Sequence, residues 1–239
     1  MSDHRLNLIL PCFNPINGWE IRVCQHLASL QKQLDDSVIE PIFINDGSVK
    51  GVEQAHLTYL KEKIPHIKII QYQDNQGKGY AVREGFRQAD APYILFTDID
   101  FPYLESDLIR LYKKLCTEKI DILVGIRQAD YYKQTPWYRA FISKMLKLII
   151  GRFLKVKITD TQGGLKGFSR KGREILLKTT INRYLFDLEI IKIASRSKDI
   201  KLESMPVELR KEVQFASLNW VILKREFFNL LKIFFSKNT

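Results

Sequence analysis

The sequence contains only three cysteines and four histidines among its 239 residues. Cys12, Cys24 and Cys116 are odd in number and show no CxxC spacing, which argues against a disulfide framework and against a cysteine zinc site. We expect free thiols in a reducing cytosol. All four histidines precede residue 67 and none adjoins a polar motif, which argues against a histidine metal site or a His-based triad.

Long apolar runs, repeats and low-complexity segments are also missing. No apolar run reaches the roughly 18 residues that cross a membrane, and the first residues lead directly into a strand pattern without a signal peptide. We therefore expect a cytoplasmic protein. The length suits one continuous domain over residues 1–215, with residues 216–239 as a C-terminal helix of the same compact unit.

Charge is distributed unevenly along the chain. Residues 1–100 carry 10 basic and 13 acidic side chains, whereas residues 101–239 carry 28 basic and 14 acidic ones. The basic second half predicts contact with an anionic partner such as lipid, phosphate or nucleic acid. No nucleic-acid recognition motif accompanies it, and the aromatic residues cluster with aliphatic ones rather than on a stacking platform, so we expect no nucleic-acid partner.

Apolar strand patterns alternate with helical patterns in the first half. Strands are predicted at residues 6–10, 39–44, 67–72, 93–97 and 121–125. Helices are predicted at residues 21–34, in the segment that follows the second strand and ends at about residue 63, at residues 77–88 and at residues 104–116. This order implies βαβ units. The predicted fold class is α/β, with a mostly parallel central sheet flanked by helices.

The second half is less regular. It predicts a basic amphipathic helix at 137–152, a polar loop at 159–169 that enters a short strand, helices at 170–178 and 184–195, and a strand at 200–205. Residues 218–235 form an apolar helix with a narrow polar stripe. Two interpretations stay open for this helix: packing on the core or a second subunit, and interfacial binding to a membrane.

Asp98 and Asp100 directly follow the apolar strand at 93–97. In an extended segment, side chains two positions apart lie on the same side, so one divalent cation could bridge both carboxylates. Mg²⁺ or Mn²⁺ prefers such oxygen ligands and completes its shell with diphosphate oxygens and water. The alternative is a simple turn at the strand end, where Asp is common.

Three other strand ends carry polar residues, and parallel strands would bring all four ends to one edge. They are Pro11–Asn14, Asn45–Ser48 and Asp74–Gly79. Asp46 could accept hydrogen bonds from a nucleobase. Gly77 and Gly79 allow a ligand close to the backbone at a helix N-terminus, where Lys78 adds positive charge.

These motifs together resemble family 2 glycosyltransferases with the GT-A nucleotide-diphospho-sugar transferase fold. The resemblance rests on PxFN, NDGS, NxGKGxA and DxD, in that order. Gly125-Ile126-Arg127, Arg139, Ser143 and Asp160–Lys166 resemble the polyprenyl-phosphate sugar transferases, a group that includes dolichyl-phosphate mannose and glucose synthases. Residues 184–189 and 206–210 continue the likeness, which covers nearly the whole chain.

The resemblance implies an inverting, metal-dependent transfer of a sugar from a UDP- or GDP-sugar to a polyprenyl phosphate. It implies Asp98 and Asp100 as ligands of Mg²⁺ or Mn²⁺. The implied donor site comprises Pro11, Asn14, Asp46, Gly77, Lys78, Asp98 and Arg210. The implied acceptor-phosphate site comprises Arg127, Arg139, Ser143 and Gln162, and the implied catalytic residues are Asp100, Asp160 and Asp187.

Two positions depart from the family pattern. Pro102 stands where a further metal-ligating Gln is frequent, and Leu165 stands where Phe is usual. Pro102 leaves the metal with Asp98 and Asp100 as its predicted protein ligands, and substrate and water complete the shell. Leu165 changes an aromatic contact near the acceptor.

The acceptor decides whether the reaction needs a base. A lipid phosphate is already ionised and needs only positioning by arginines, whereas a glycan hydroxyl must lose a proton to a carboxylate. Asp160 and Asp187 are the candidate bases and Glu189 is a weaker one. For Asp187 and Glu189 the alternative is a solvated helix start.

The basic second half favours the lipid acceptor. The predicted helices at 137–152 and 218–235 suit peripheral binding at the inner face of a membrane, and a homodimer is the alternative use of their apolar faces. Two rival functions remain: transfer of a sugar to a glycan hydroxyl in surface polysaccharide synthesis, and nucleotide or membrane binding without catalysis.

Overall fold

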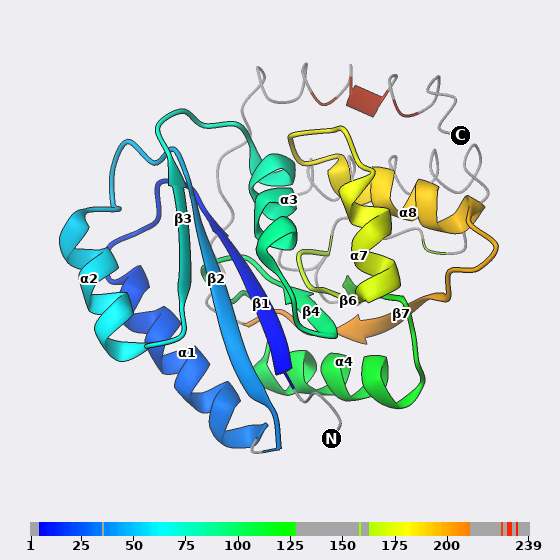
Figure 1. Ribbon diagram of the computed structural model, residues 1–239, viewed down its shortest axis with the longest axis horizontal. Helices are drawn as coiled ribbons and strands as arrows, with labels where there is room; N and C mark the ends of the chain where they lie inside the picture. Colours follow the sequence, from blue (N-terminus) through cyan, green and yellow to red (C-terminus); the bar gives the residue numbers. More distant parts are fainter. Residues whose placement is uncertain are drawn as a thin grey trace.

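The structure, a computed structural model, describes residues 5–34, 36–127, 158, 163–210, 226, 229, 230 and 233. Strands and helices alternate through the first half as the sequence predicts (Figure 1). The elements are β1 (Arg5–Cys12), α1 (Trp19–Gln33), β2 (Val38–Asp46), α2 (Gln54–Lys63), β3 (Lys68–Tyr72), α3 (Lys78–Gln88), β4 (Tyr93–Phe96), α4 (Glu105–Thr117) and β5 (Ile122–Arg127). They are followed by β6 (Lys166–Ser169), α7 (Arg170–Leu177), α8 (Phe186–Arg196) and β7 (Leu202–Val207).

The strands form one seven-stranded sheet in the order β3-β2-β1-β4-β6-β5-β7. β6 runs antiparallel to both of its neighbours, and every other pairing is parallel. The predicted α/β fold with a mostly parallel sheet is therefore confirmed. Because β6 is reversed, it begins at the edge where the six parallel strands end, and this places Lys166 at that edge.

Four predicted strand ends come too early, those of β1, β2, β5 and β7. β1 continues through Pro11 to Cys12, and β2 continues through Ile44 to Asp46. Proline has no N–H and cannot donate a hydrogen bond to a neighbouring strand, so it is disfavoured where a strand is paired on both sides. Pro11 is tolerated because β4 pairs with β1 only as far as Ile9, so that β1 has a single neighbour, β2, at Pro11.

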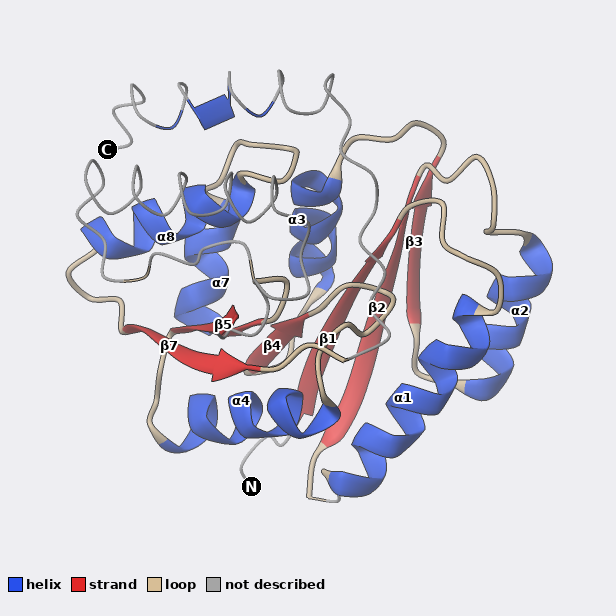
Figure 2. Cartoon of the chain, turned by 180° about the vertical axis from the view of Figure 1, so that it is seen from behind, coloured by secondary structure: helices blue, strands red, loops and turns tan. Residues whose placement is uncertain are grey.

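Helices cover both faces of the sheet. α1, α2 and α4 lie on one face, and α3, α7 and α8 lie on the other (Figure 2). Alternate residues of each strand supply the two apolar cores; in β4, Leu95 packs with the α1/α4 face and Ile94 and Phe96 pack with the α3/α8 face. This is the period of two that strands impose.

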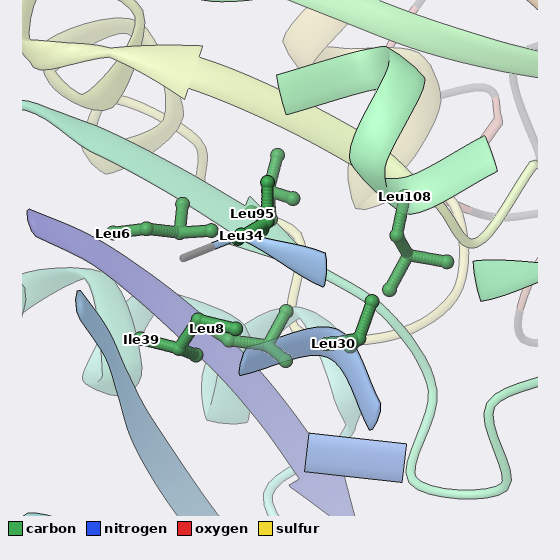
Figure 3. A pocket seen from close by; sticks show the side chains of 7 residues that line it. All are labelled: Leu6, Leu8, Leu30, Leu34, Ile39, Leu95 and Leu108. Carbon is green, nitrogen blue, oxygen red and sulfur yellow. The ribbon is translucent and has the colours of Figure 1, made fainter. Parts of the chain in front are cut away.

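Around β1 and β4, the α1/α4 face is packed mainly by aliphatic side chains. Figure 3 shows them converging from β1, α1, β2, β4 and α4 around a small apolar pocket lined by Leu6, Leu8, Leu30, Leu34, Ile39, Leu95 and Leu108. Burial of each such side chain contributes roughly 1.5–3 kcal/mol. This core fixes β1 and β4, whose ends carry the polar motifs.

Two predicted helices fall largely outside the described residues. Residues 137–152 lie outside them entirely. Of residues 218–235, the structure describes Glu226, Asn229, Leu230 and Ile233, all helical. No helix among the described residues is long and apolar enough to cross a membrane.

Candidate active site at the carboxyl edge of the sheet

The polar motifs meet where the parallel strands end. Asp46 ends β2, Asp98 follows β4 by two residues, and Arg127 ends β5. The loop before β6 reaches the same edge through Gly163 and Gly164. Such an edge is where open α/β sheets bind their ligands. Arg139, Ser143, Asp160 and Gln162 lie outside the described residues.

Asp98 and Asp100 lie in a turn. β4 ends at Phe96, and the N–H of Phe101 donates to the carbonyl of Asp98 over 3.0 Å. Phe101 adopts φ 46°, a left-handed conformation unusual for a bulky residue. The prediction of an extended segment here is therefore wrong. A tight turn changes the chain direction immediately after the strand.

The turn is anchored by its last residue. The Phe101 side chain is fully buried, and its ring packs against His26 of α1 with centroids 4.8 Å apart. Burial of a large aromatic ring stabilises the unusual backbone conformation. Asp98 and Asp100 are thus held at the end of β4 by packing on the α1/α4 face.

The two carboxylates influence each other. Burial against surrounding protein atoms and the negative charge of Asp98 raise the pKa of Asp100 above its usual range, although part of Asp100 remains exposed. A divalent cation would relieve this repulsion. Among the described residues, no three His, Cys, Asp or Glu side chains form a metal cluster. Two hard carboxylates at an open edge fit Mg²⁺ or Mn²⁺ that shares its shell with diphosphate and water.

Glycine is required at positions 163 and 164 because other atoms of the protein lie very close to the backbone there. A Cβ on Gly163 would lie 2.0 Å from the carbonyl oxygen of Gly125, and one on Gly164 would lie 2.5 Å from Oδ2 of Asp98. The N–H of Gly164 donates to the Tyr103 hydroxyl over 2.7 Å. Because these two residues have no side chain, the loop can lie directly against the Asp98 carboxylate.

Two lysines face the carboxylates from the α3/α8 face. Lys78, the first residue of α3, pairs through Nζ with Oδ1 of Asp98. Lys166 is fully buried, and its Nζ donates to Asp187 Oδ1 over 2.7 Å and to the carbonyl of Gly163. Positive and negative groups therefore lie close together beneath the edge.

The pKa values of these groups reflect competing effects. Burial acts to lower the pKa of Lys78, but the charges of Asp98 and Asp187 outweigh it and the net shift is upward. Burial raises the pKa of Asp187, although Lys166 and Lys78 oppose that rise. The two lysines are the partners that favour a charged Asp187 in this apolar surrounding.

Asp187 and Glu189 are buried, so the alternative of a solvated helix start is wrong. Asp187 is 5% exposed and Glu189 is 3% exposed. Glu189 accepts hydrogen bonds from the N–H groups of Thr180 and Ile181, over 2.9 and 2.8 Å, and from the Thr180 hydroxyl. Glu189 therefore orders the loop that precedes α8. Asp187, predicted as catalytic, is paired with Lys166.

Asp46 has a different environment from the one expected of a residue that binds a nucleobase. It is 3% exposed, and its two oxygens accept hydrogen bonds from the Tyr72 hydroxyl, the Asn75 amide and the N–H groups of Gln76 and Gly77. Burial raises its pKa against these hydrogen bonds. In the structure Asp46 holds the loop before α3 through these hydrogen bonds, and so places Gly77 and Lys78.

Asn14 joins the first two loops at the edge. Its Oδ1 accepts from the N–H of Val49 over 2.9 Å, and its own N–H donates to the Ser48 hydroxyl over 2.9 Å. Asn14 adopts φ 48°, a conformation that asparagine tolerates better than most residues. Pro11 lies within β1 below this loop.

Arg210 points to the α1/α4 face. Its Nε donates to the carbonyl of Tyr103 over 3.0 Å, and its guanidinium pairs with Glu105 over 3.3 Å. Burial acts to raise the pKa of Glu105, but hydrogen bonds from Ser29 and His26 outweigh it and lower that pKa. The predicted reach of Arg210 to donor phosphates is not observed in these contacts. Pro102 accepts from the Arg210 N–H over 2.8 Å.

Three of the four described positions of the C-terminal segment contact the α3/α8 side of the protein. Leu230 and Ile233 are buried with the α3/α8 core. Glu226 accepts from the N–H of Leu185 over 3.0 Å, and Lys192 donates to the carbonyl of Ile233. At these positions the structure shows the core-packing alternative, and the other faces of the segment lie outside the described residues.

Sequence reasoning gave no role to three residues at the edge. They are Tyr103, which accepts from Gly164, and His26 and Glu105, which support the turn. The burial of Lys166 was also not predicted, although its motif was noted. The sequence signal that could have predicted this burial is the position of the lysine at the start of a strand.

Comparison with known proteins identifies the family. Residues 8–176 match the model of glycosyl transferase family 2. The chain belongs to this family. It is 29% identical over 215 residues to a dolichyl-phosphate beta-glucosyltransferase of Trichomonas vaginalis, covering 85% of this chain and 65% of that protein. It is 26% identical over 242 residues to the dolichyl-phosphate beta-glucosyltransferase of Drosophila melanogaster, covering 93% and 73%.

Solved structures confirm the fold of this family 2 glycosyltransferase. Glucosyl-3-phosphoglycerate synthase from Mycobacterium tuberculosis, solved with Mg²⁺ and uridine diphosphate, superposes with a TM-score of 0.69. The alignment covers 98% of this chain and 80% of that one at 12% identity. The predicted family and GT-A fold are therefore confirmed.

Proposed function

We propose that this glycosyltransferase transfers a hexose, with glucose as the first candidate, from a nucleoside diphosphate sugar to a polyprenyl phosphate. The observation that carries the proposal is the turn bearing Asp98 and Asp100 at the carboxyl edge, in a chain whose relatives are dolichyl-phosphate beta-glucosyltransferases. The chain spans 65% and 73% of those two relatives.

The donor would lie across the carboxyl edge. In this proposal Asp98 and Asp100 hold Mg²⁺ or Mn²⁺, which when bound supplies positive charge to the leaving diphosphate. Lys78 would face the phosphates at the start of α3, and Gly77, whose N–H donates to Asp46, would border them by placing Lys78. Pro11 and Asn14 would border the nucleotide, and Asp46 would act by holding the loop before α3.

The acceptor would approach the end of β5. Arg127 ends that strand, and we propose that Arg139, Ser143 and Gln162 complete the phosphate site with it, with Asp160 lining the reaction centre. A phosphate oxygen is already ionised, so it can attack the anomeric carbon without a base. In-line attack would invert that carbon.

The environments of Asp187 and Glu189 make both poor bases for a glycan hydroxyl, whereas a phosphate acceptor needs none. A hydroxyl nucleophile needs a carboxylate free to take its proton. Asp187 is buried and paired with Lys166, and Glu189 is occupied by backbone N–H groups. We therefore assign Asp187 to charge balance around the lysines. A binding protein without catalysis is disfavoured because both predicted metal ligands, Asp98 and Asp100, are present at the carboxyl edge.

Peripheral membrane binding, at the inner face, is part of the proposal. A polyprenyl phosphate resides in a membrane, so the active-site edge must reach its surface. Flotation with vesicles containing anionic lipid measures this binding, and we expect it to weaken with salt. A homodimer stays a prediction that sedimentation can check.

A donor-by-acceptor screen tests the proposal. UDP-glucose, UDP-galactose, GDP-glucose and GDP-mannose are offered with dolichyl or undecaprenyl phosphate, or with oligosaccharide acceptors, with Mn²⁺ or with EDTA. We expect a glycolipid phosphodiester, formed with Mn²⁺ and absent with EDTA. Product with oligosaccharides alone would contradict the lipid acceptor, and transfer unaffected by EDTA would contradict the metal role.

A further inference from the structure

Lys78 binds the same carboxylate that is proposed to bind the metal. Its Nζ contacts Oδ1 of Asp98, and its place at the first position of α3 is fixed by the hydrogen bonds from Gln76 and Gly77 to Asp46. The backbone before Lys78 is fixed further because a Cβ on Gly77 would meet the carbonyl of Asn182 at 2.5 Å. The fold therefore fixes the backbone position from which Lys78 reaches Asp98.

Asp98 offers a cation little room beside this ammonium. Oδ1 is taken by Lys78, and Oδ2 faces the backbone of Gly164, where even a methyl group would lie 2.5 Å away. A divalent cation on Asp98 would also stand close to a like charge. Repulsion between such close charges is strong in a partly desolvated site.

Other groups that favour a positive charge lie close to the Lys78 ammonium. Asp187 lies near enough to act on its charge, and its Nζ lies 5.4 Å from the centre of the Phe96 ring. Lys166 lies 5.5 Å from the same ring and holds Asp187 in place. The Lys78 ammonium is a point charge on a flexible stem, so it can move to a diphosphate without rearrangement of the backbone.

We propose that Lys78 is a built-in competitor for the divalent cation: it holds Asp98 until the metal arrives and then moves to the donor diphosphate, so that metal and nucleotide sugar bind in a coupled way. This inference rests on the proposed metal and nucleotide-sugar site. Its consequence is that removal of the ammonium strengthens binding of the metal alone and weakens binding of the nucleotide.

The test measures binding of Mn²⁺ alone, without nucleotide, by electron paramagnetic resonance of free Mn²⁺. We expect Lys78→Met to bind Mn²⁺ about tenfold more tightly than the wild type, in line with the coupling of close charge pairs. Lys78→Arg keeps the positive charge, so it should show no such gain. Lys113→Met removes an exposed lysine from α4 and is the charge-matched control, for which we expect wild-type Mn²⁺ affinity.

A second titration, of UDP in saturating Mn²⁺, measures the other half of the exchange. We expect Lys78→Met to bind UDP about tenfold more weakly. Lys78→Gln, which keeps a polar head group, is measured in parallel so that a folding failure of the Met variant leaves the test intact. Unchanged or weaker Mn²⁺ binding in the folded variant overturns the inference.

These results are separable from the proposed function. If the wild type makes the glycolipid but Lys78→Met gains no Mn²⁺ affinity, the competitor role fails and the function stands. If Lys78→Met gains Mn²⁺ affinity while the wild type transfers no sugar in the screen, the competitor role stands and the function fails.

Discussion

The two faces of the sheet differ in what they bury. The α1/α4 face is packed mainly by aliphatic side chains, some of which are shown in Figure 3, and in the described part of the chain its buried charge is Asp107, in the first turn of α4. The α3/α8 face has a similar aliphatic core, but among the described residues it also buries six charged side chains: Asp46, Arg83, Lys166, Asp187, Glu189 and Lys192. Burying charges costs stability that apolar residues would not cost.

The two faces therefore contribute differently to the candidate active site. The α1/α4 face fixes β1, β4 and, through His26 and Phe101, the turn that carries Asp98. The α3/α8 face brings Lys78, Lys166 and Asp187 under the same turn. One face thus positions the carboxylates, and the other sets their electrostatic surroundings.

The largest expected stability effect lies on the charged face. Asp187→Ala leaves the fully buried Lys166 without that carboxylate, and loss of one partner of a buried pair costs about 3–5 kcal/mol. Urea unfolding of Asp187→Ala, Lys166→Met and the double variant measures the coupling. We expect the double variant to lose at least about 1 kcal/mol less than the sum of the two single losses. Additive losses would show that the pair is not coupled.

At the junction of the faces, Gly164→Ala places a Cβ 2.5 Å from the Asp98 carboxylate. The carboxylate must move, so we expect glycosyl transfer to fall by about 10- to 100-fold, since small misplacements at a reacting centre have effects of this size. Steady-state kinetics measures this change.

Gly167→Ala is the matched control for that variant. Its Cβ would meet the Leu111 side chain at 2.5 Å, within the α1/α4 core and away from Asp98. We expect it to lose about 1–3 kcal/mol of stability through overpacking and to keep its transfer rate per folded molecule. Equal kinetic losses in both variants would remove any special role for Gly164.

The smallest effect is expected at Glu105 on the α1/α4 face, because its hydrogen bond with His26 and its ion pair with Arg210 are partly exposed. Its pKa is lowered in the folded chain, so its contribution is present at neutral pH and disappears as the pH falls through that lowered value. Glu105→Gln should lose up to about 1 kcal/mol at pH 7 and nothing at acidic pH.

Urea unfolding of wild type and Glu105→Gln across this pH range checks the sign. Glu118→Gln, at the exposed end of α4, is the control. A stability difference that grows as the pH falls would contradict the assigned shift.

The fold was largely predictable from sequence because its signals are local and repeated. Apolar runs separated by helical periodicity predicted β1 to β5 and α1 to α4, and the polar strand ends predicted the edge where Asp98 lies. The turn after Asp98 was not predictable in this way. It depends on the packing of Phe101 against His26, a residue distant in the sequence.

Partners of buried polar groups were the other limit. The carboxylate of Asp46 accepts its hydrogen bonds from a loop about thirty residues later in the sequence. Asp187 is paired with Lys166, which lies 21 positions earlier. Hydrophobic periodicity carries no information on such pairs, because both charged residues interrupt apolar patterns. The sequence thus indicated which residues gather at the edge, and the structure shows which of them are already bonded to one another.

The most direct test of the account compares Asp100→Asn with Leu95→Ala, one variant at the proposed metal site and one in the α1/α4 core. The proposed Mn²⁺-dependent transfer of glucose to polyprenyl phosphate and the free energy of unfolding are measured for both. We predict that Asp100→Asn loses about 1000-fold in transfer at wild-type stability, while Leu95→Ala loses about 2–5 kcal/mol of stability and keeps its transfer rate per folded molecule. Wild-type transfer by Asp100→Asn would contradict the account.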